Sequence, residues 1–287
     1  MAKIIDCEGY VQELEANIKD EIIKNDIKAN LLIINTNNDD ASNVYIRNKI
    51  KKCKNFGLNA DVIYFKKENY KDINEMELDV LKCILEANNN HNIHGIILQL
   101  PVQDGIDYMK LIDAIEPHKD VDGLSYYNNA LLYKGMQSIY PATAIGIVKL
   151  LEYHNMELDG SNIVIVGRSI LVGKPLFHLL EQRNATVTLA HSHTKDLSKI
   201  TKKADIVICA IGIPKYFNNT FFKYNAKIID VGINRDENEK LCGDVDFDTL
   251  TEKQECTIVP KGIGKITSSM VVYNLIQCYK ISKYINR

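Results

Sequence analysis

The sequence lacks paired cysteines, long apolar runs and an excess of charge of either sign. Its seven cysteines include no C-x-x-C pair, and no histidine lies at a metal-like spacing from two of them. We therefore expect no metal, no disulfide framework and reduced thiols in the cytoplasm. No apolar run approaches the length of about 20 residues that crosses a bilayer, and the first residues lack the apolar core of a signal peptide. No membrane partner is expected.

The charges nearly balance, because 35 Lys and Arg face 37 Asp and Glu, for a net charge of -2. A nucleic-acid partner gains no support from this balance. The longest basic cluster, residues 47–54, is typical of the solvated face of a helix. The sequence also contains no G-x-S-x-G, H-E-x-x-H or Walker A motif, so serine hydrolases, zincins and P-loop NTPases lose support.

With 287 residues the chain is long enough for two domains. Short apolar runs alternate with amphipathic segments, which predicts an α/β fold with mostly parallel sheets. We expect strands at 31–34, 60–65, 94–100, 162–166, 186–190, 205–210 and 227–231, and helices at 42–56, 73–87, 174–183 and 269–284. In the helix at 73–87, Leu78, Leu81 and Leu85 share one face. A turn-rich stretch from Pro117 to Asn129 predicts a domain junction.

The first candidate site follows the apolar strand at 162–166. A glycine, Gly167, ends that strand, and Gly173 begins a helix six residues later. This layout presents backbone N–H groups and a helix N-terminus to an anion. The spacing is not G-x-G-x-x-G, so a dinucleotide site and a plain strand-turn-helix both remain open.

The next strand ends at residues 190–194, where a doubly wound sheet faces the adenosine ribose. This tip offers hydroxyls, the imidazoles of His191 and His193, and Lys195, whereas Asp196 comes late. With Arg168 in the turn, the composition favours a 2′-phosphate and hence NADP. NAD, or a polar strand end without a ligand, remains the alternative.

Three further patterns carry reactive side chains. Tyr45 and Lys49 are four residues apart and would share one helix face. A lysine with a pKa lowered by desolvation can act as a general acid or base, although such a pair is more often packing. Gln99 ends a buried strand, where ligands of open α/β sheets bind. Asp120 and Asp122 lie in a turn and could accept hydrogen bonds from an amino-pyrimidine or serve the turn itself.

These stretches occur together and in order, with others of the same kind. They are Ser42-x-x-Tyr45-x-x-x-Lys49, Gln99-Leu100-Pro101, Lys119-Asp120-Val121-Asp122-Gly123, Gly167-Arg168-Ser169, Val172-Gly173-Lys174-Pro175, Asn184-Ala185-Thr186-Val187-Thr188, His191-Ser192, Ala204-Asp205-Ile206-Val207, Asp230-Val231-Gly232-Ile233-Asn234 and Gly243-Asp244-Val245. Through them the chain resembles, over nearly its whole length, the bifunctional methylenetetrahydrofolate dehydrogenase/methenyltetrahydrofolate cyclohydrolase family.

The resemblance implies a fold and a reaction. The fold would be an N-terminal α/β catalytic domain (residues 1–120 plus 268–287) and, across a cleft, a Rossmann-like NADP-binding domain (residues 121–267). The enzyme would oxidise 5,10-methylenetetrahydrofolate with NADP and hydrolyse the methenyl product to 10-formyltetrahydrofolate. It would be a cytoplasmic homodimer, with a tetrahydrofolate-type molecule as its partner.

The resemblance also implies roles for individual residues. Tyr45 would stack on the p-aminobenzoyl ring, Lys49 would be the cyclohydrolase lysine, Gln99 would hydrogen-bond Lys49, and Asp122 would bind the pteridine. Substrate-binding positions are Ser42, Tyr45, Gln99, Leu100, Pro101, Asp122, Gly262 and Thr267. Cofactor-binding positions are Gly167, Arg168, Ser169, Gly173, Ser192 and Ile233.

Two segments depart from the family pattern. The family motif P-G-G-V-G-P-M-T becomes Pro260-Lys261-Gly262-Ile263-Gly264-Lys265-Ile266-Thr267, and P-C-T-P-x-G becomes Pro141-Ala142-Thr143-Ala144-Ile145-Gly146. If Lys261 needs a positive φ, it carries strain that glycine would not. The loss of the proline from the second motif should loosen its turn. These changes motivate one alternative, a monofunctional NAD(P)-dependent dehydrogenase with weak or no cyclohydrolase activity. A non-catalytic binding protein is a third hypothesis, against which the intact Lys49 argues.

Overall fold

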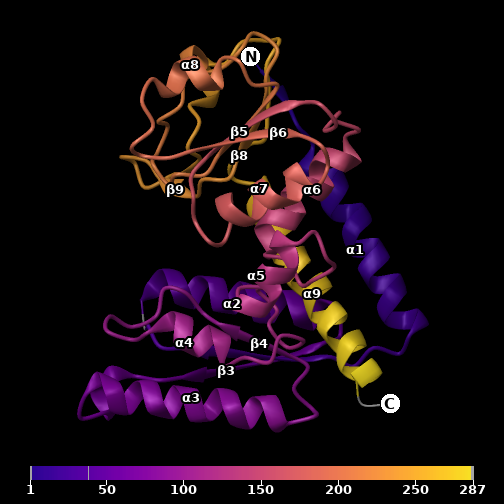
Figure 1. Ribbon diagram of the computed structural model, residues 1–287, viewed down its shortest axis with the longest axis vertical. Coiled ribbons are helices and arrows are strands. Elements are labelled where there is room, and N and C mark those ends of the chain that lie inside the picture. Colours follow the sequence, from indigo (N-terminus) through magenta and orange to yellow (C-terminus); the bar gives the residue numbers. More distant parts are fainter. Residues whose placement is uncertain (1, 38, 286–287) are drawn as a thin grey trace. The chain divides into compact units, whose positions relative to one another are not determined.

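The computed structural model describes residues 2–37 and 39–285 (Figure 1). The chain forms two compact units, Met1–Leu14 with Pro141–Thr267 and Glu15–Tyr140 with Ser268–Arg287. We call them the six-stranded unit and the three-stranded unit after their main sheets. Two long helices, α1 (Cys7–Lys24) and α9 (Ile263–Ile285), contain a unit boundary within their own length.

The three-stranded unit is built on a parallel sheet. Its central strand β2 (Asn30–Asn35) pairs with β3 (Asn59–Tyr64) on one side and β4 (Gly95–Leu98) on the other. Its own helices are α2 (Asp40–Asn55), α3 (Ile73–Asn89), α4 (Tyr108–Asp113), α5 (Tyr126–Tyr133) and the short η1 (Lys67–Asn69). These strands and the helices α2 and α3 confirm the predicted elements to within two residues at each end.

The buried face of α3 differs from the predicted one. Met76, Val80 and Ile84 are fully buried and pack with β2, β4 and α4 in one apolar cluster. Leu78 and Leu85, which the sequence placed on a common face, are 60% and 48% exposed. The helix carries apolar residues around much of its circumference, so periodicity alone did not select the face that meets the sheet.

The two compact units divide the chain at a different place from the predicted junction at 117–129. The segment is part of the three-stranded unit, which extends to Tyr140. The Asn274 side chain of α9 donates to the carbonyl oxygens of Val121 (2.9 Å) and Tyr140 (2.8 Å), and so connects α9 to both ends of the segment 121–140. Residues 121–140 thus group with the three-stranded unit and residues 2–14 with the six-stranded unit, and the predicted domain bounds stay a prediction.

The six-stranded unit contains an entirely parallel sheet of order β1-β11-β8-β7-β5-β6. Its strands are β1 (Lys3–Ile4), β5 (Asn162–Val166), β6 (Thr186–Ala190), β7 (Ile206–Cys209), β8 (Lys227–Asp230) and β11 (Glu255–Cys256). Two short strands between β8 and β11, β9 (Asn234–Arg235) and β10 (Leu241–Cys242), form a separate antiparallel pair. The pairing of β1 with β11 explains why the amino-terminal residues belong to this unit.

The helices of this unit connect its parallel strands. They are α6 (Ala142–Tyr153), α7 (Gly173–Glu181), α8 (Leu197–Thr201), η2 (Asn219–Phe221) and η3 (Phe247–Thr249). In Figure 1, α7 follows β5 and precedes β6, as in a right-handed β-α-β unit. The segment that was expected to be a loosened turn is the start of α6, where Ile145 N–H donates to Pro141 O at 3.0 Å.

All seven cysteines are free thiols, and every one except the half-buried Cys83 is buried. Burial raises the thiol pKa of several of them, and the pKa of Cys53 reaches about 11. Within residues 2–37 and 39–285, no three His, Cys, Asp or Glu side chains are grouped as a metal site would require. No helix in that same part of the chain is both long and apolar enough to cross a bilayer.

Candidate active site

Both sheets have a topological switch point, where the connections leave a central strand in opposite directions. In the three-stranded unit, β3 and β4 lie on opposite sides of β2, and Gln99 follows β4 at its carboxyl end. In the six-stranded unit, β6 and β7 lie on opposite sides of β5, and Gly167 follows β5. Ligands of open α/β sheets bind outside the carboxyl ends of strands at such points, so each unit has one topologically favoured site.

In the three-stranded unit, Lys49 and Gln99 are joined by a hydrogen bond. The Lys49 ammonium donates to Gln99 Oε1 at 3.0 Å, and Gln99 Nε2 donates to the Leu100 carbonyl at 2.7 Å. The second bond fixes which end of the amide faces the lysine. Tyr45 lies one turn earlier on α2 and is 47% exposed, so its ring is available to a ligand.

The two carboxylates of the turn between α4 and α5 have different functions. Asp120 is buried and accepts hydrogen bonds from Ser125 N–H (2.8 Å) and Asn128 Nδ2 (3.0 Å), which start helix α5. Asp122 is partly buried, and its carboxylate makes no hydrogen bond or ion pair with any described residue. Burial raises the pKa of Asp122, against an opposing effect from Lys49. Asp122 is thus a carboxylate left open beside the lysine.

The lysine of the same motif is a structural residue. Lys119 Nζ donates to the carbonyl oxygens of Ala87, Asn88 and Asn90 at 2.7–3.0 Å, and so caps the carboxyl end of α3. Burial lowers the pKa of this ammonium. A cation at a helix carboxyl end is favoured by the helix dipole. The motif therefore supplies one helix cap, one turn carboxylate and one free carboxylate.

Other residues expected at the substrate lie nearby in sequence but are engaged locally. Ser42 is buried; its hydroxyl donates to Asp39 Oδ2 at 2.7 Å and its N–H donates to Asp39 Oδ1 at 2.8 Å, so both take part in the amino-terminal cap of α2. Leu100 and Pro101, joined by a cis peptide bond, follow Gln99 directly. Their contacts with a substrate remain a prediction.

In the six-stranded unit, the loop between β5 and α7 has room for no side chain at its two glycines. Gly167 has φ +125°, and a Cβ there would lie 2.1 Å from Ala210 O. A Cβ at Gly173 would lie 1.9 Å from Gly167 O. The loop closes tightly on itself at the amino end of α7, where backbone N–H groups favour an anion.

Three polar residues of this region are open to a ligand. Arg168 and Ser169 are exposed in the loop, and the Arg168 guanidinium has no partner among the residues that the structure describes. Ser169 Oγ accepts the Val172 N–H at 3.2 Å, which tightens the turn. Ser192, at the tip after β6, is exposed as well. A cradle that glycine alone can form and an unpaired guanidinium together suit a cofactor with phosphate groups.

The sequence assigned no role to Asp244, which organises the loops after β7 and β8. Its buried carboxylate accepts the N–H groups of Ile211 (2.6 Å), Gly212 (3.1 Å) and Ile213 (3.0 Å), and Asn234 Nδ2 at 2.9 Å. All four donors are neutral N–H groups, so the negative charge of the Asp244 carboxylate is stabilised by their dipoles and not by a cation. The predicted cofactor residue Ile233, 47% exposed, precedes Asn234 and is held in place through it.

A second buried carboxylate supports the first. Asp230 Oδ1 accepts the N–H groups of Gly232 (3.1 Å) and Asp244 (2.9 Å), and Oδ2 accepts that of Val245 (3.0 Å). Burial, together with the nearby Asp244, raises the pKa of Asp230 to about 7, despite these donors. Both residues were visible in quoted motifs, but an acceptor for distant backbone N–H groups leaves no periodic pattern in a sequence.

The altered loop at 260–267 shows the predicted strain. Lys261 has φ +86°, a conformation that glycine adopts without cost. Gly262 is buried, and a Cβ there would lie 2.3 Å from Ile258 O. The Thr267 hydroxyl lies 3.0 Å from that of Thr143 and donates to Ile263 O at 3.1 Å. Lys265, the other departure, forms an ion pair with Glu8 at 3.0 Å.

These features define a two-domain α/β enzyme with a dinucleotide-binding sheet and a lysine–amide–carboxylate group in its other unit. Comparison with known proteins specifies it. The family described as "Tetrahydrofolate dehydrogenase/cyclohydrolase, catalytic domain" matches residues 5–122, and its "NAD(P)-binding domain" matches residues 141–283. The curated bifunctional protein FolD of Agathobacter rectalis is 41% identical over 284 residues, which cover 98% of this chain and 100% of the relative.

Solved structures agree. The bifunctional dehydrogenase/cyclohydrolase FolD of Campylobacter jejuni is 32% identical, with a TM-score of 0.91 over 98% of this chain and 99% of its own. The Trypanosoma brucei enzyme, solved with NADP and an inhibitor, is 28% identical, with a TM-score of 0.90 over 98% of each chain. The chain belongs to the tetrahydrofolate dehydrogenase/cyclohydrolase family and carries both of its domains. The predicted family, fold class and bifunctional enzyme are confirmed.

Proposed function

We propose that the chain oxidises 5,10-methylenetetrahydrofolate with NADP and hydrolyses the resulting 5,10-methenyltetrahydrofolate to 10-formyltetrahydrofolate. The observation that carries the proposal is the Lys49–Gln99 hydrogen bond of 3.0 Å with the unpartnered Asp122 carboxylate in the same unit. Membership of a family with both activities supports the two steps.

Each side chain of this group suits one part of the substrate. The exposed Tyr45 ring would stack on the p-aminobenzoyl group, and Asp122 would accept paired donors from the amino-pyrimidine of the pteridine. Ser42, Leu100, Pro101, Gly262 and Thr267 are the remaining proposed substrate positions. Ser42 would act there through its cap of α2, since its hydroxyl is already used.

The cofactor would bind to the six-stranded unit. The glycine cradle at Gly167 and Gly173, with Ser169, would hold the phosphate groups, and Arg168 with Ser192 would select the 2′-phosphate of NADP over NAD. Ile233 would pack near the nicotinamide. When bound, the cofactor supplies the hydride acceptor. The NADP bound in the Trypanosoma brucei relative supports this choice.

The cyclohydrolase step requires proton transfer, and Lys49 is placed for it. The water that attacks the methenyl carbon gives up a proton. When the ring opens, the ring nitrogen takes up a proton. An ammonium held in one orientation by the Gln99 carbonyl oxygen can exchange protons at a fixed position. Lys49 would carry these protons, and Gln99 would keep it directed at the reacting carbon.

We further propose that the enzyme is a cytoplasmic homodimer. Seven free thiols and the resemblance to the family support this proposal. Light scattering of the purified protein across a concentration series would test the dimer, and a monomer at all concentrations would contradict it.

One observation favours a second candidate, a dehydrogenase with weak cyclohydrolase. The strained Lys261 occupies a loop position where the family has glycine. The deciding experiment follows reduced cofactor and the methenyl intermediate together in the ultraviolet, with NADP or NAD and 5,10-methylenetetrahydrofolate. Reduced cofactor without accumulated intermediate, after subtraction of uncatalysed hydrolysis, indicates both activities. Accumulated intermediate indicates the dehydrogenase alone, and no reduction contradicts both.

A further inference from the structure

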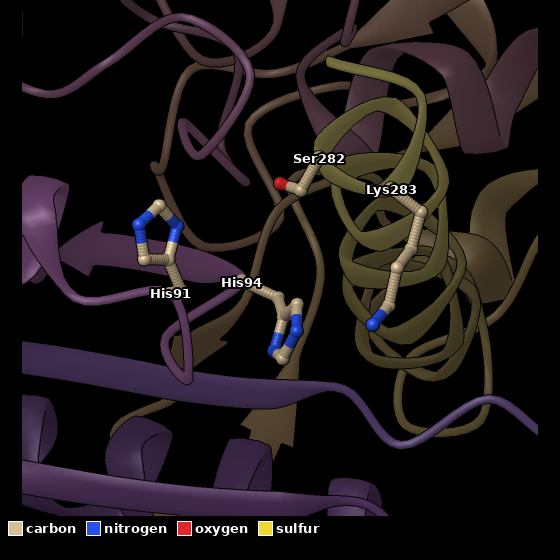
Figure 2. A pocket seen from close by; sticks show the side chains of 4 residues that line it. All are labelled: His91, His94, Ser282 and Lys283. Carbon is tan, nitrogen blue, oxygen red and sulfur yellow. The ribbon is translucent and has the colours of Figure 1, made fainter. Parts of the chain in front are cut away.

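A pocket of about 360 Å³ opens in the three-stranded unit at a place that the proposed chemistry does not use. It is lined by His91 and His94, from the segment between α3 and β4, and by Ser282 and Lys283, near the end of α9 (Figure 2). His94 precedes the amino end of β4, whereas Gln99 follows its carboxyl end. The pocket therefore lies at the amino ends of the strands, whereas Gln99 lies at their carboxyl ends.

The Ser282 hydroxyl is buried without a partner. Ser282 is 6% exposed, and its Oγ has no hydrogen-bond partner among the described residues. Figure 2 shows the hydroxyl on the side of α9 that faces the two imidazoles. Buried hydroxyls are nearly always hydrogen-bonded, so an open one at a pocket wall indicates an occupant that accepts its proton.

His94 supplies a second oriented donor. Its Nδ1 accepts the Asn30 N–H at 3.2 Å, which leaves the proton of the neutral ring on Nε2. That N–H has no acceptor within residues 2–37 and 39–285. The ring is 8% exposed and packs at a tilt against the Tyr279 ring with centroids 4.8 Å apart, so it cannot turn freely to find another partner.

The charges around the pocket are positive. Burial lowers the pKa of His94, and Lys283 and Lys119 lower it further, with no acid opposing them. Lys283 forms no ion pair with a described residue. Glu21, a carboxylate that reaches α9, is neutralised by its ion pair with Lys280.

We propose that this pocket binds a phosphate group, either as orthophosphate or as a phosphate monoester. Two elements supply three donors to it: α9 supplies the Ser282 hydroxyl and the Lys283 ammonium, and the segment before β4 supplies the His94 Nε2–H. No described carboxylate lines it. The volume exceeds what orthophosphate needs, so an ester carrying a small polar group also has room.

The test titrates the NADP-saturated enzyme with orthophosphate and, separately, with glycerol 3-phosphate. Saturation with NADP is meant to occupy the proposed cofactor site at Arg168, so that phosphate does not bind there. Histidine ring resonances are followed by NMR together with the thermal midpoint. We expect a saturable shift of the His94 ring and a rise of its pKa as the anion binds. Saturation by orthophosphate identifies free phosphate as sufficient, and saturation by the monoester alone identifies an ester.

Three variants assign the site. Ser282→Ala and Lys283→Met each remove one donor, and His94→Asn removes Nε2–H while keeping an acceptor for the Asn30 N–H. Each should weaken binding about tenfold, since hydrogen bonds to charged groups contribute more than neutral ones. Lys24→Met, which removes an exposed lysine of α1 that pairs with no described carboxylate, should change the affinity less than threefold. Unchanged affinity in Ser282→Ala and His94→Asn, or no saturable binding to the parent, overturns the proposal.

A stability measurement separates an open hydroxyl from a structural one. In phosphate-free buffer, Ser282→Ala should melt no lower than the parent, because it deletes a buried hydroxyl that nothing satisfies. With phosphate, the parent should gain thermal stability and the variant should not. A variant that melts lower in the absence of phosphate would mean that the hydroxyl serves the fold, which contradicts the proposal.

Discussion

The Lys49 ammonium and the Gln99 side-chain oxygen, 50 residues apart in sequence, are joined by a hydrogen bond of 3.0 Å. The bond connects helix α2 to the end of strand β4, and the Gln99 amide is itself fixed by its bond to the Leu100 carbonyl. This relationship makes Gln99 a positioning residue for the lysine, and it can be separated from the lysine's own chemistry by mutation.

Lys49→Met should abolish cyclohydrolase activity, with a loss of at least about 100-fold, because general acid–base groups contribute that much or more. Binding of NADP, measured by fluorescence of the reduced cofactor, should remain. Lys51→Met is the matched control, since Lys51 is an exposed lysine of the same helix. Unchanged cyclohydrolase in Lys49→Met would contradict the role of the lysine.

Gln99→Leu should lower cyclohydrolase kcat by about tenfold or more, because the ammonium loses its acceptor and its fixed direction. Gln99→Glu, which keeps an acceptor for the ammonium, should retain more of the activity than Gln99→Leu. Gln103→Leu is the control, because Gln103 is hydrogen-bonded through its backbone: its N–H donates to Thr36 Oγ1 at 3.0 Å and its carbonyl oxygen accepts the Ile106 N–H at 3.1 Å. An equal fall in activity in Gln99→Leu and Gln99→Glu would indicate a purely structural role for Gln99.

Asp244→Asn should raise the KM for NADP by about tenfold or more while cyclohydrolase activity persists. The amide replaces one accepting oxygen by a donor, so N–H groups of the Ile211–Ile213 loop lose their acceptor. Asn234→Ala removes one donor of the four and should have a smaller effect in the same direction. Asp248→Asn, at an exposed site, serves as the control. Equal loss of both activities would show that Asp244 serves folding alone.

Lys261→Gly should stabilise the protein by about 0.5–1 kcal/mol, because glycine adopts φ +86° without the steric cost of a side chain. The gain is limited by the greater freedom of glycine in the unfolded chain. Lys253→Gly, at an exposed turn residue without a positive φ, should not stabilise. Urea unfolding of the three proteins measures the difference, and a destabilised Lys261→Gly would show that the lysine makes compensating contacts.

The pKa of Asp230, raised to about 7 by burial, predicts a pH-dependent stability. Because the folded state binds this proton more tightly than the unfolded state, the contribution is greatest in acid and is lost as pH rises through 7. Over pH 5 to 8 it amounts to about 2 kcal/mol. Urea unfolding should show that the advantage of the parent over Asp230→Asn shrinks by this amount across that range. An advantage that grows with pH would reverse the assignment.

Local patterns predicted the strands well, and β5 and β6 begin and end at the predicted residues. Buried parallel strands are short runs of apolar residues between turn signals, and such runs are legible in one sequence. Helix faces were less legible: α3 buries Met76 and Val80 rather than Leu78, because the sheet it meets is set by distant strands. Helix α6 was not predicted at all, since it is apolar on every side and has no period.

The candidate site divided in the same way. The Lys49–Gln99 contact was expected and is present, because both residues stand at positions that topology brings together. The distinction between Asp120 and Asp122 could not be predicted, since the two differ only in which backbone N–H groups surround them. Asp244 and Asp230 act through backbone donors up to 33 residues away, a relationship that only the folded chain contains.

The reactivity of the buried thiols can report local unfolding of each unit. Each unit carries cysteines shielded from solvent, Cys209 and Cys256 in one and Cys53 and Cys278 in the other. A pulse of alkylating reagent, read peptide by peptide in a mass spectrometer, would mark each thiol only while its surroundings are open. Half-buried Cys83 would react first and so provide the reference rate of alkylation. The rate of local opening could then be measured separately for the two sheets in the unaltered enzyme, without an introduced label.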